Sequence, residues 1–80
     1  MDDRLRKKLA EIFNIKEKEI SSEQDSSTIE SWDSLTQMDL VLGLEEEYKI
    51  DLATDEIVDL DSIFKIVEML KRKGVNFEDS

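Results

Sequence analysis

The chain has 80 residues, of which 21 are acidic and 11 basic, and its formal net charge is −10. This length predicts one small domain and leaves little room to enclose a catalytic cavity. The negative charge argues against nucleic acid and anionic membranes as partners, whereas an apolar content of 39% is enough for a folded core.

Histidine and cysteine are missing from the sequence, and glycine occurs twice. The usual catalytic triads, zinc sites, disulfides and glycine-rich phosphate loops therefore cannot be built. The acidic residues between Asp51 and Asp61 lack the spacing and the glycine of a calcium loop. We therefore expect a protein that is not an enzyme and that has no metal site.

No apolar run reaches the length of a signal peptide or a membrane span, and the acidic residues near the start are atypical of a transit peptide. These features predict a cytoplasmic protein without membrane insertion. Residues 1–80 are expected to form a single domain, with a flexible tail at about 76–80.

The first segment is expected to form a helix that Asp2 or Asp3 can cap. Its apolar residues share one helical stripe: Leu5, Leu9, Ile12 and Phe13. Residues 14–33 show no helical period, so they predict a long connection that has room for a short helical turn. Scattered isoleucines are expected to fix this connection to the core: Ile15, Ile20 and Ile29.

A second helix is expected to start at Asp33 or Ser34, because Ser34 and Gln37 fit an S-x-x-Q capping box. The wide apolar surface of this helix predicts packing against more than one neighbour: Leu35, Met38, Val41, Leu42, Leu44 and Tyr48. Gly43 costs about 1 kcal/mol relative to alanine in mid-helix, which favours close packing of another helix at this point.

After a short extended stretch at Ile50–Leu52, Thr54 can cap a brief third helix, and Asp61 or Ser62 can cap a fourth. The fourth helix has its inward residues at helical spacing, Phe64 at an edge and Gly74 at its end: Ile63, Ile66, Val67 and Leu70. The expected fold is all-α, a four-helix bundle with three longer helices, one short helix and a long loop between the first two.

Negative charge is concentrated between Asp33 and Asp61, where ten acidic residues accompany a single base, Lys49. Such a surface can simply keep the protein soluble. It can also dock basic partner proteins and raise their association rates.

The stretch WDSLTQMDLVLGLEEEYKIDL resembles the core of the acyl carrier protein family. The resemblance rests on Asp33-Ser34-Leu35 and on the residues that follow at the family's spacing: Leu40, Leu44, Glu45, Glu46, Tyr48 and Ile50. It extends more loosely to Asp55-Glu56 and to Leu60 through Ile63. From the residues alone, an ordinary helix cap is the better interpretation of Ser34.

The resemblance implies that Ser34, preceded by Asp33, receives a 4′-phosphopantetheine arm from coenzyme A through a phosphopantetheinyl transferase. It implies that acyl-loading and acyl-processing enzymes with basic docking patches recognise a set of residues on and after the second helix: Leu35, Met38, Asp39, Glu45, Glu46, Asp55 and Glu56. Residues near an apolar cleft would shelter the cargo of a monomeric carrier: Leu44, Ile57, Leu60 and Ile63.

The sequence departs from housekeeping fatty-acid carriers, because Ser31 and Trp32 replace their usual residues before the aspartate and a later proline is missing. W-D-S-L resembles stand-alone carriers of specialised pathways and some aminoacyl or peptidyl carriers. Fatty-acyl, polyketide-type and aminoacyl cargo therefore stay open, as does a helical adaptor without a prosthetic group. Trp32 is expected to anchor the loop in the core, with a partner contact as the alternative.

Overall fold

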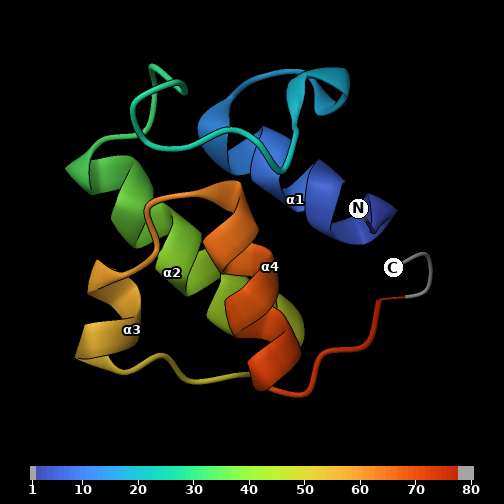
Figure 1. Cartoon of the computed structure of the whole chain (residues 1–80), viewed down its shortest axis with the longest axis vertical. Coiled ribbons are helices and arrows are strands. Elements are labelled where there is room, and N and C mark those ends of the chain that lie inside the picture. The colour runs from blue at the N-terminus through green and yellow to red at the C-terminus, as the bar shows by residue number, and fades with distance from the viewer. Residues whose placement is uncertain (1, 78–80) are drawn as a thin grey trace.

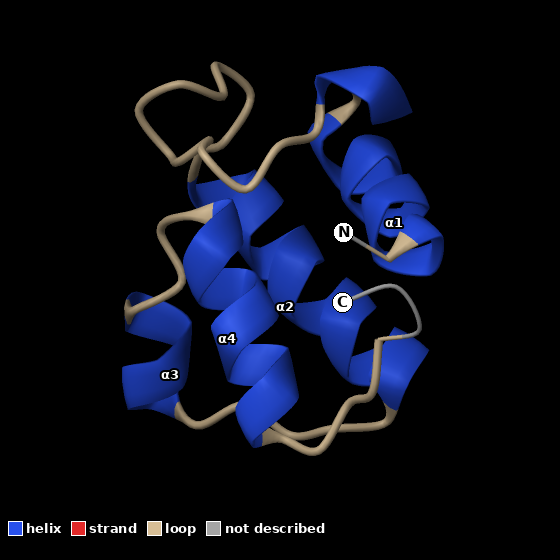
Figure 2. Ribbon diagram, turned by 45° about the vertical axis from the view of Figure 1, so that its right-hand side comes forward, coloured by secondary structure: helices blue, strands red, loops and turns tan. Residues whose placement is uncertain are grey.

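Residues 2–77 are described by the computed structural model, in which the helices run α1 Asp3–Phe13, α2 Ser34–Tyr48, α3 Thr54–Val58 and α4 Ile63–Arg72. Within that range the chain contains no strand. The prediction of an all-α bundle with three longer helices, one short helix and a long first connection is confirmed. Figures 1 and 2 show α2 and α4 lying between α1 and α3.

Side-chain caps fix the start of two helices as the sequence predicts. An Asp2 carboxylate oxygen accepts the backbone N–H of Leu5 at 3.1 Å, and the Ser62 hydroxyl accepts that of Lys65 at 3.1 Å. These caps satisfy N–H groups that have no partner within their helices. After α4, Gly74 has φ +91°, a left-handed conformation that glycine adopts without strain.

Two predicted caps are wrong. At α2 the cap is Asp33 and not Ser34, because an Asp33 carboxylate oxygen accepts the Thr36 N–H at 2.9 Å. The Gln37 side chain, which the capping box requires, is bonded elsewhere. At α3 the preceding residue is Ala53, and Thr54 is the first helical residue.

The long connection between α1 and α2 contains one 3-10 turn at Glu17–Glu19. Ile20 and Ile29 are buried, so they fix the connection to the core as expected. Its middle also bonds to the start of α4, where the Ser26 N–H donates to the Asp61 carbonyl at 2.9 Å and the Ile63 N–H to the Gln24 carbonyl at 3.0 Å. This connection is therefore held at several points along its length.

The core lies between α1, α2 and α4, and the inner face of α2 is narrower than the sequence suggests. Within α2, the buried residues are Leu40, Val41 and Leu44. The apolar line of Leu35, Met38 and Leu42 is exposed, so it takes no part in the packing of α2 on its neighbours. An α-helix has room for two apolar faces, and burial here uses only one of them.

Gly43 lets α1 approach α2 closely, which confirms the expectation from the sequence. A Cβ at this position would lie 3.2 Å from Ile12 Cδ1 and 3.3 Å from Lys8 Cε. Toward the other end of α2, Arg4 pairs with Glu47, and its guanidinium lies 4.9 Å from the centroid of the Tyr48 ring.

No helix among the described residues is long and apolar enough to cross a membrane. Between residues 2 and 77, no three acidic side chains converge in a group that could hold a metal ion. Of the tail expected at about 76–80, Phe77 is partly buried against the core, while residues 78–80 lie outside the described residues.

Candidate functional site

Ser34 is the first residue of α2, and its side chain is exposed to solvent. The N–H groups of the first helical turn have no acceptor within the helix, and the helix dipole adds partial positive charge at this end. An anion attached to the Ser34 hydroxyl would therefore lie beside favourable N–H groups. Four turns of helix behind the serine hold its backbone in a fixed direction.

Asp33 precedes this serine and is also exposed. The hydrogen bond from the Thr36 backbone N–H holds the pKa of the Asp33 carboxyl below its usual range. Asp33 is therefore ionised at neutral pH and occupied in capping the helix. This frees the Ser34 hydroxyl from a capping role.

The backbone just before Ser34 is fixed by two further hydrogen bonds. The Ser31 hydroxyl donates to the Phe13 carbonyl at the end of α1, at 2.6 Å. The Thr36 hydroxyl in turn donates to the Ser31 carbonyl at 2.7 Å. The serine is thus presented from a turn that is tied both to α1 and to the first turn of α2.

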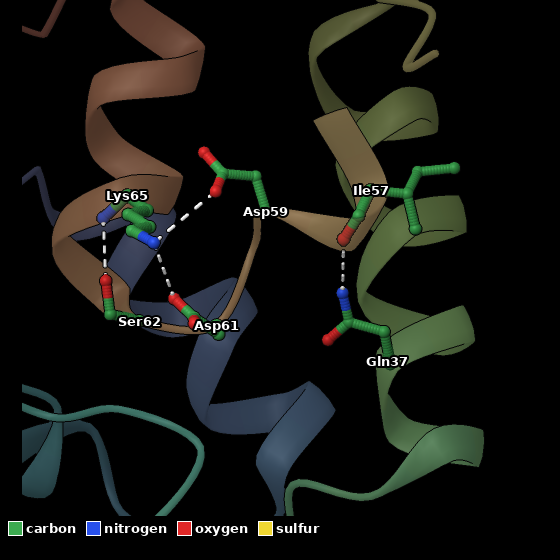
Figure 3. Close-up of polar contacts among 6 residues, drawn as sticks. All are labelled: Gln37, Ile57, Asp59, Asp61, Ser62 and Lys65. Carbon is green, nitrogen blue, oxygen red and sulfur yellow. Dashed lines mark hydrogen bonds and ion pairs between the residues drawn. The ribbon is translucent and has the colours of Figure 1, made fainter. Parts of the chain in front are cut away.

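Trp32 is buried beneath this turn, as expected for a core anchor. Its ring lies 4.6 Å from that of Phe13 between centroids, with the planes inclined at 38°. Its indole N–H donates to the Gln37 side-chain oxygen at 2.6 Å, and the Gln37 amide N–H donates to the Ile57 carbonyl at 3.0 Å. Figure 3 shows the Gln37 side chain reaching from α2 to this carbonyl of α3.

The role of Gln37 was not identified from the sequence, although a signal for it was present. Gln37 lies seven residues before Leu44, so the two share the inner face of α2. A polar residue in register with a buried face needs hydrogen-bond partners inside the protein. The capping-box pattern assigned the Gln37 side chain to the start of the helix, so its need for partners inside the protein was not recognised.

The acidic residues expected to meet partners fall into two groups. Asp39, Glu46 and Asp55 are exposed, and their side chains form no hydrogen bond or ion pair within residues 2–77. Glu45 accepts the Leu52 N–H at 2.9 Å. Glu56 accepts the Ala53 N–H at 3.0 Å and pairs with Lys73 at 2.8 Å, and these bonds lower the pKa of its carboxyl.

Glu45 and Glu56 therefore have structural tasks besides any contact with a partner. Asp39, Glu46 and Asp55 have no such structural task, so their carboxylates are available to a docking protein.

Exposed apolar side chains accompany these acids on α2 and α3. Leu35 is 79% exposed and Val58 77% exposed, and Met38 and Leu42 are more than half exposed. Leu35 and Met38 were expected to meet partners, whereas Leu42 and Val58 were not identified. Leu42 follows Met38 by four residues and so extends the same line along the helix.

The residues expected to line a cargo cleft lie at the inner side of α2, α3 and α4. Leu44, Leu60 and Ile63 are closed to solvent and belong to the core, and Ile57 is half-buried. An apolar chain can therefore reach these side chains only if a neighbouring element moves.

Comparison with known proteins matches a family described as phosphopantetheine attachment site to residues 3–70. This range runs from the start of α1 into the last turn of α4 and includes Ser34. The chain is also similar to proteins named acyl carrier protein from three strains of Buchnera aphidicola subsp. Acyrthosiphon pisum, Tuc7, APS and 5A. Each is 27% identical over 77 residues, which cover 94% of this chain and 94% of the relative.

Proposed function

Because the chain belongs to the acyl carrier protein family and spans its phosphopantetheine attachment domain, we propose that Ser34 bears the arm. The chain is a carrier and not a catalyst, and its cofactor is covalent 4′-phosphopantetheine. We propose that it carries acyl intermediates in the synthesis of fatty acids or related specialised lipids or polyketides. One observation supports Ser34 most strongly: it is an exposed serine at the start of α2, beside an aspartate that already caps the helix.

Attachment requires little chemistry from the chain itself. The Ser34 oxygen attacks the phosphorus that bears the pantetheine in coenzyme A, the pyrophosphate bond breaks, and adenosine 3′,5′-bisphosphate leaves. The serine proton would pass to a base of the transferase, because this chain has no histidine and the lowered pKa of the Asp33 carboxyl makes it a weak base. The attached arm supplies a thiol that holds the cargo as a thioester.

Once attached, the phosphodiester keeps one negative charge at the N-terminus of α2. The helix dipole and the N–H groups of its first turn favour this charge. The described structure therefore fits the group in both access and electrostatics.

Members of this family interact with phosphopantetheinyl transferases and with biosynthetic enzymes. We propose that these enzymes dock on exposed acids and apolar side chains of α2 and α3: Leu35, Met38, Asp39, Glu46 and Asp55. Basic patches on the partners would be drawn to the acids, and the apolar side chains would be buried on contact. A net charge of −10 also supports a carrier that is monomeric between encounters, because like charges repel.

For the cargo, we propose an acyl chain that enters between Leu44, Ile57, Leu60 and Ile63. These side chains are apolar, so they would stabilise a hydrocarbon chain more than an amino acid. The alternative is an aminoacyl or peptidyl carrier, which would leave these side chains packed on one another. Mass spectrometry of the thioester cargo on protein isolated from its host distinguishes the two classes.

The remaining alternative is a helical adaptor without a prosthetic group. The test is to incubate the protein with coenzyme A, magnesium and a broad-specificity transferase, and then to measure its intact mass. A carrier gains one phosphopantetheine group per chain, and Ser34→Ala gains none. If several transferases leave the wild-type mass unchanged, the adaptor is correct.

A further inference from the structure

Helix α3 is the least buried α-helix of the described structure. It has five residues, Thr54–Val58, and none of them is buried. An isolated helix shorter than about 12 residues is marginal in water. The position of α3 therefore depends on its contacts with neighbouring elements more than on its own helical hydrogen bonds.

Two of these contacts are ion pairs with α4 or with the residue that follows it. Lys65 pairs with Asp59, just after α3, at 3.4 Å and with Asp61 at 3.1 Å (Figure 3). These side chains are between 44% and 63% exposed, so water and salt weaken the attraction. Lys73 pairs with Glu56 at 2.8 Å near the C-terminal end of α4.

On the α2 side, α3 is held by the Gln37 amide. Gln37 is half-buried, and its N–H bond to the Ile57 carbonyl is the hydrogen bond between α2 and α3 among residues 2–77. Its two partners also fix its orientation, because an indole N–H can only donate and a carbonyl oxygen can only accept. The Gln37 side chain therefore cannot rotate by half a turn without losing both bonds.

The same side chain reaches the turn that presents Ser34. Trp32 lies two residues before the serine, packs on Phe13 and donates to Gln37. A single amide thus joins α3 to the buried anchor of the Ser34 turn. If Trp32 or α3 moves, a hydrogen bond of Gln37 is lost, and the other of the two is then held less firmly.

We propose that Gln37 is a positioning residue that couples the Ser34 turn to α3 and holds α3 closed over the core. Release of the Gln37 amide frees α3 on its α2 side and gives an apolar cargo access to Leu44, Leu60 and Ile63. The cargo part of this proposal rests on the proposed carrier function, whereas the coupling is a property of the unmodified chain.

The first test is amide hydrogen exchange by NMR on unmodified protein, compared between wild type and Gln37→Met. Methionine has a similar length and makes neither bond. Of the two bonds lost, the one to the Ile57 carbonyl holds α3, and its loss is expected to raise the exchange of the Ile57 and Leu60 N–H groups roughly two- to twelve-fold. Unchanged exchange at these amides would overturn the proposal.

Two variants test the two hydrogen bonds of Gln37 separately. Gln37→Glu keeps an oxygen for Trp32 but turns an acceptor toward the Ile57 carbonyl. It should raise α3 exchange while the emission of the single tryptophan stays at its wild-type wavelength. Trp32→Phe keeps a ring against Phe13 but lacks the donor, and it should also raise α3 exchange. If Trp32→Phe leaves α3 unaffected, the coupling to the Ser34 turn is wrong.

Ile66→Val controls for a general loss of stability, because Ile66 is fully buried in α4 and makes none of these bonds. The proposal expects this variant to raise exchange across the core without selecting α3. If Ile66→Val and Gln37→Met raise the amide exchange of α3 equally, Gln37 only contributes to overall stability, and the proposal is overturned.

The cargo consequence is tested on protein that carries an octanoyl thioester. Hydroxylamine cleavage of the thioester should be several-fold slower in Gln37→Met, because release of α3 lets the octanoyl chain enter the apolar core, which shelters it from the reagent. Failure to load the arm would count against the proposed function and leave the exchange result standing. Loading with unchanged cleavage would contradict the cargo access alone.

Discussion

An Asp33 carboxylate oxygen accepts the backbone N–H of Thr36 at 2.9 Å, and this bond begins the helix whose first residue is the exposed Ser34. The cap lies in the residue just before the proposed attachment point. The side chain that starts the helix and the side chain that receives the arm are therefore neighbours with separate tasks.

The Asp33 cap makes a measurable contribution to the pH dependence of stability. The pKa of the Asp33 carboxyl is lowered in the folded protein. Its contribution to stability is therefore complete above the pKa of the unfolded chain, about 4, and is lost as the pH falls through the lower pKa of the folded protein. Asp33→Asn keeps a capping oxygen but cannot ionise. The advantage in melting temperature of wild type over this variant should therefore shrink from about pH 5 to about pH 3. An advantage that stays constant with pH would contradict this origin.

Leu35 and Leu40 are a matched pair on opposite faces of α2, with exposed fractions of 79% and 0%. Leu40→Ala should lower the free energy of unfolding by about 2–5 kcal/mol, whereas Leu35→Ala should change it by less than about 0.5 kcal/mol. Leu35→Ala should instead slow modification by a transferase several-fold. Urea unfolding and transferase kinetics on both variants test this, and a stability loss in Leu35→Ala would show that the exposed line packs on the chain.

Asp39 and Glu46 test electrostatic docking better than Glu45, which has a structural bond to Leu52. Reversing Asp39 or Glu46 to Lys, one at a time, should reduce the association rate with a basic partner enzyme and flatten its dependence on salt. Surface plasmon resonance at several salt concentrations measures both. Glu11→Lys, which removes an exposed acid from α1, should have a much smaller effect, and an equal effect would point to net charge alone.

Gly43 tests the close approach of α1 to α2. In Gly43→Ala the new methyl group would press on the ends of the Ile12 and Lys8 side chains, which can shift by a few tenths of an ångström. The gain in helix propensity is about 1 kcal/mol, so the net effect should be a small stabilisation. Gly43→Leu should destabilise the protein by at least about 1–3 kcal/mol, because the larger side chain must push α1 away. Thermal unfolding of both variants decides the matter, and equal melting temperatures would contradict the close packing.

The sequence was sufficient to predict the helices because their ends have strong local signals. Asp2 and Ser62 each precede an apolar helical stripe, and both cap their helices in the structure. The caps of α2 and α3 were harder to place, because neighbouring residues offered competing signals. At α2 two candidate acceptors, Asp33 and Ser34, stand side by side, and only their backbone geometry decides between them.

The position of the site could be predicted from the sequence, but the contacts around it could not. The D-S-L motif indicated Ser34, and periodicity showed an apolar helix behind it. Periodicity could not show which apolar line of α2 is buried, because that depends on where α1 and α4 pack. The bridge from Trp32 through Gln37 to Ile57 joins residues from three segments, so only the fold brings them together.

The most direct test of the account is to digest the modified protein and find, by tandem mass spectrometry, which residue carries the phosphopantetheine. We predict that the arm is on Ser34 alone, that Ser34→Ala abolishes it, and that Ser62→Ala, which changes another serine at a helix start, retains it. An adduct on any other serine, or an adduct that persists in Ser34→Ala, would contradict the central claim.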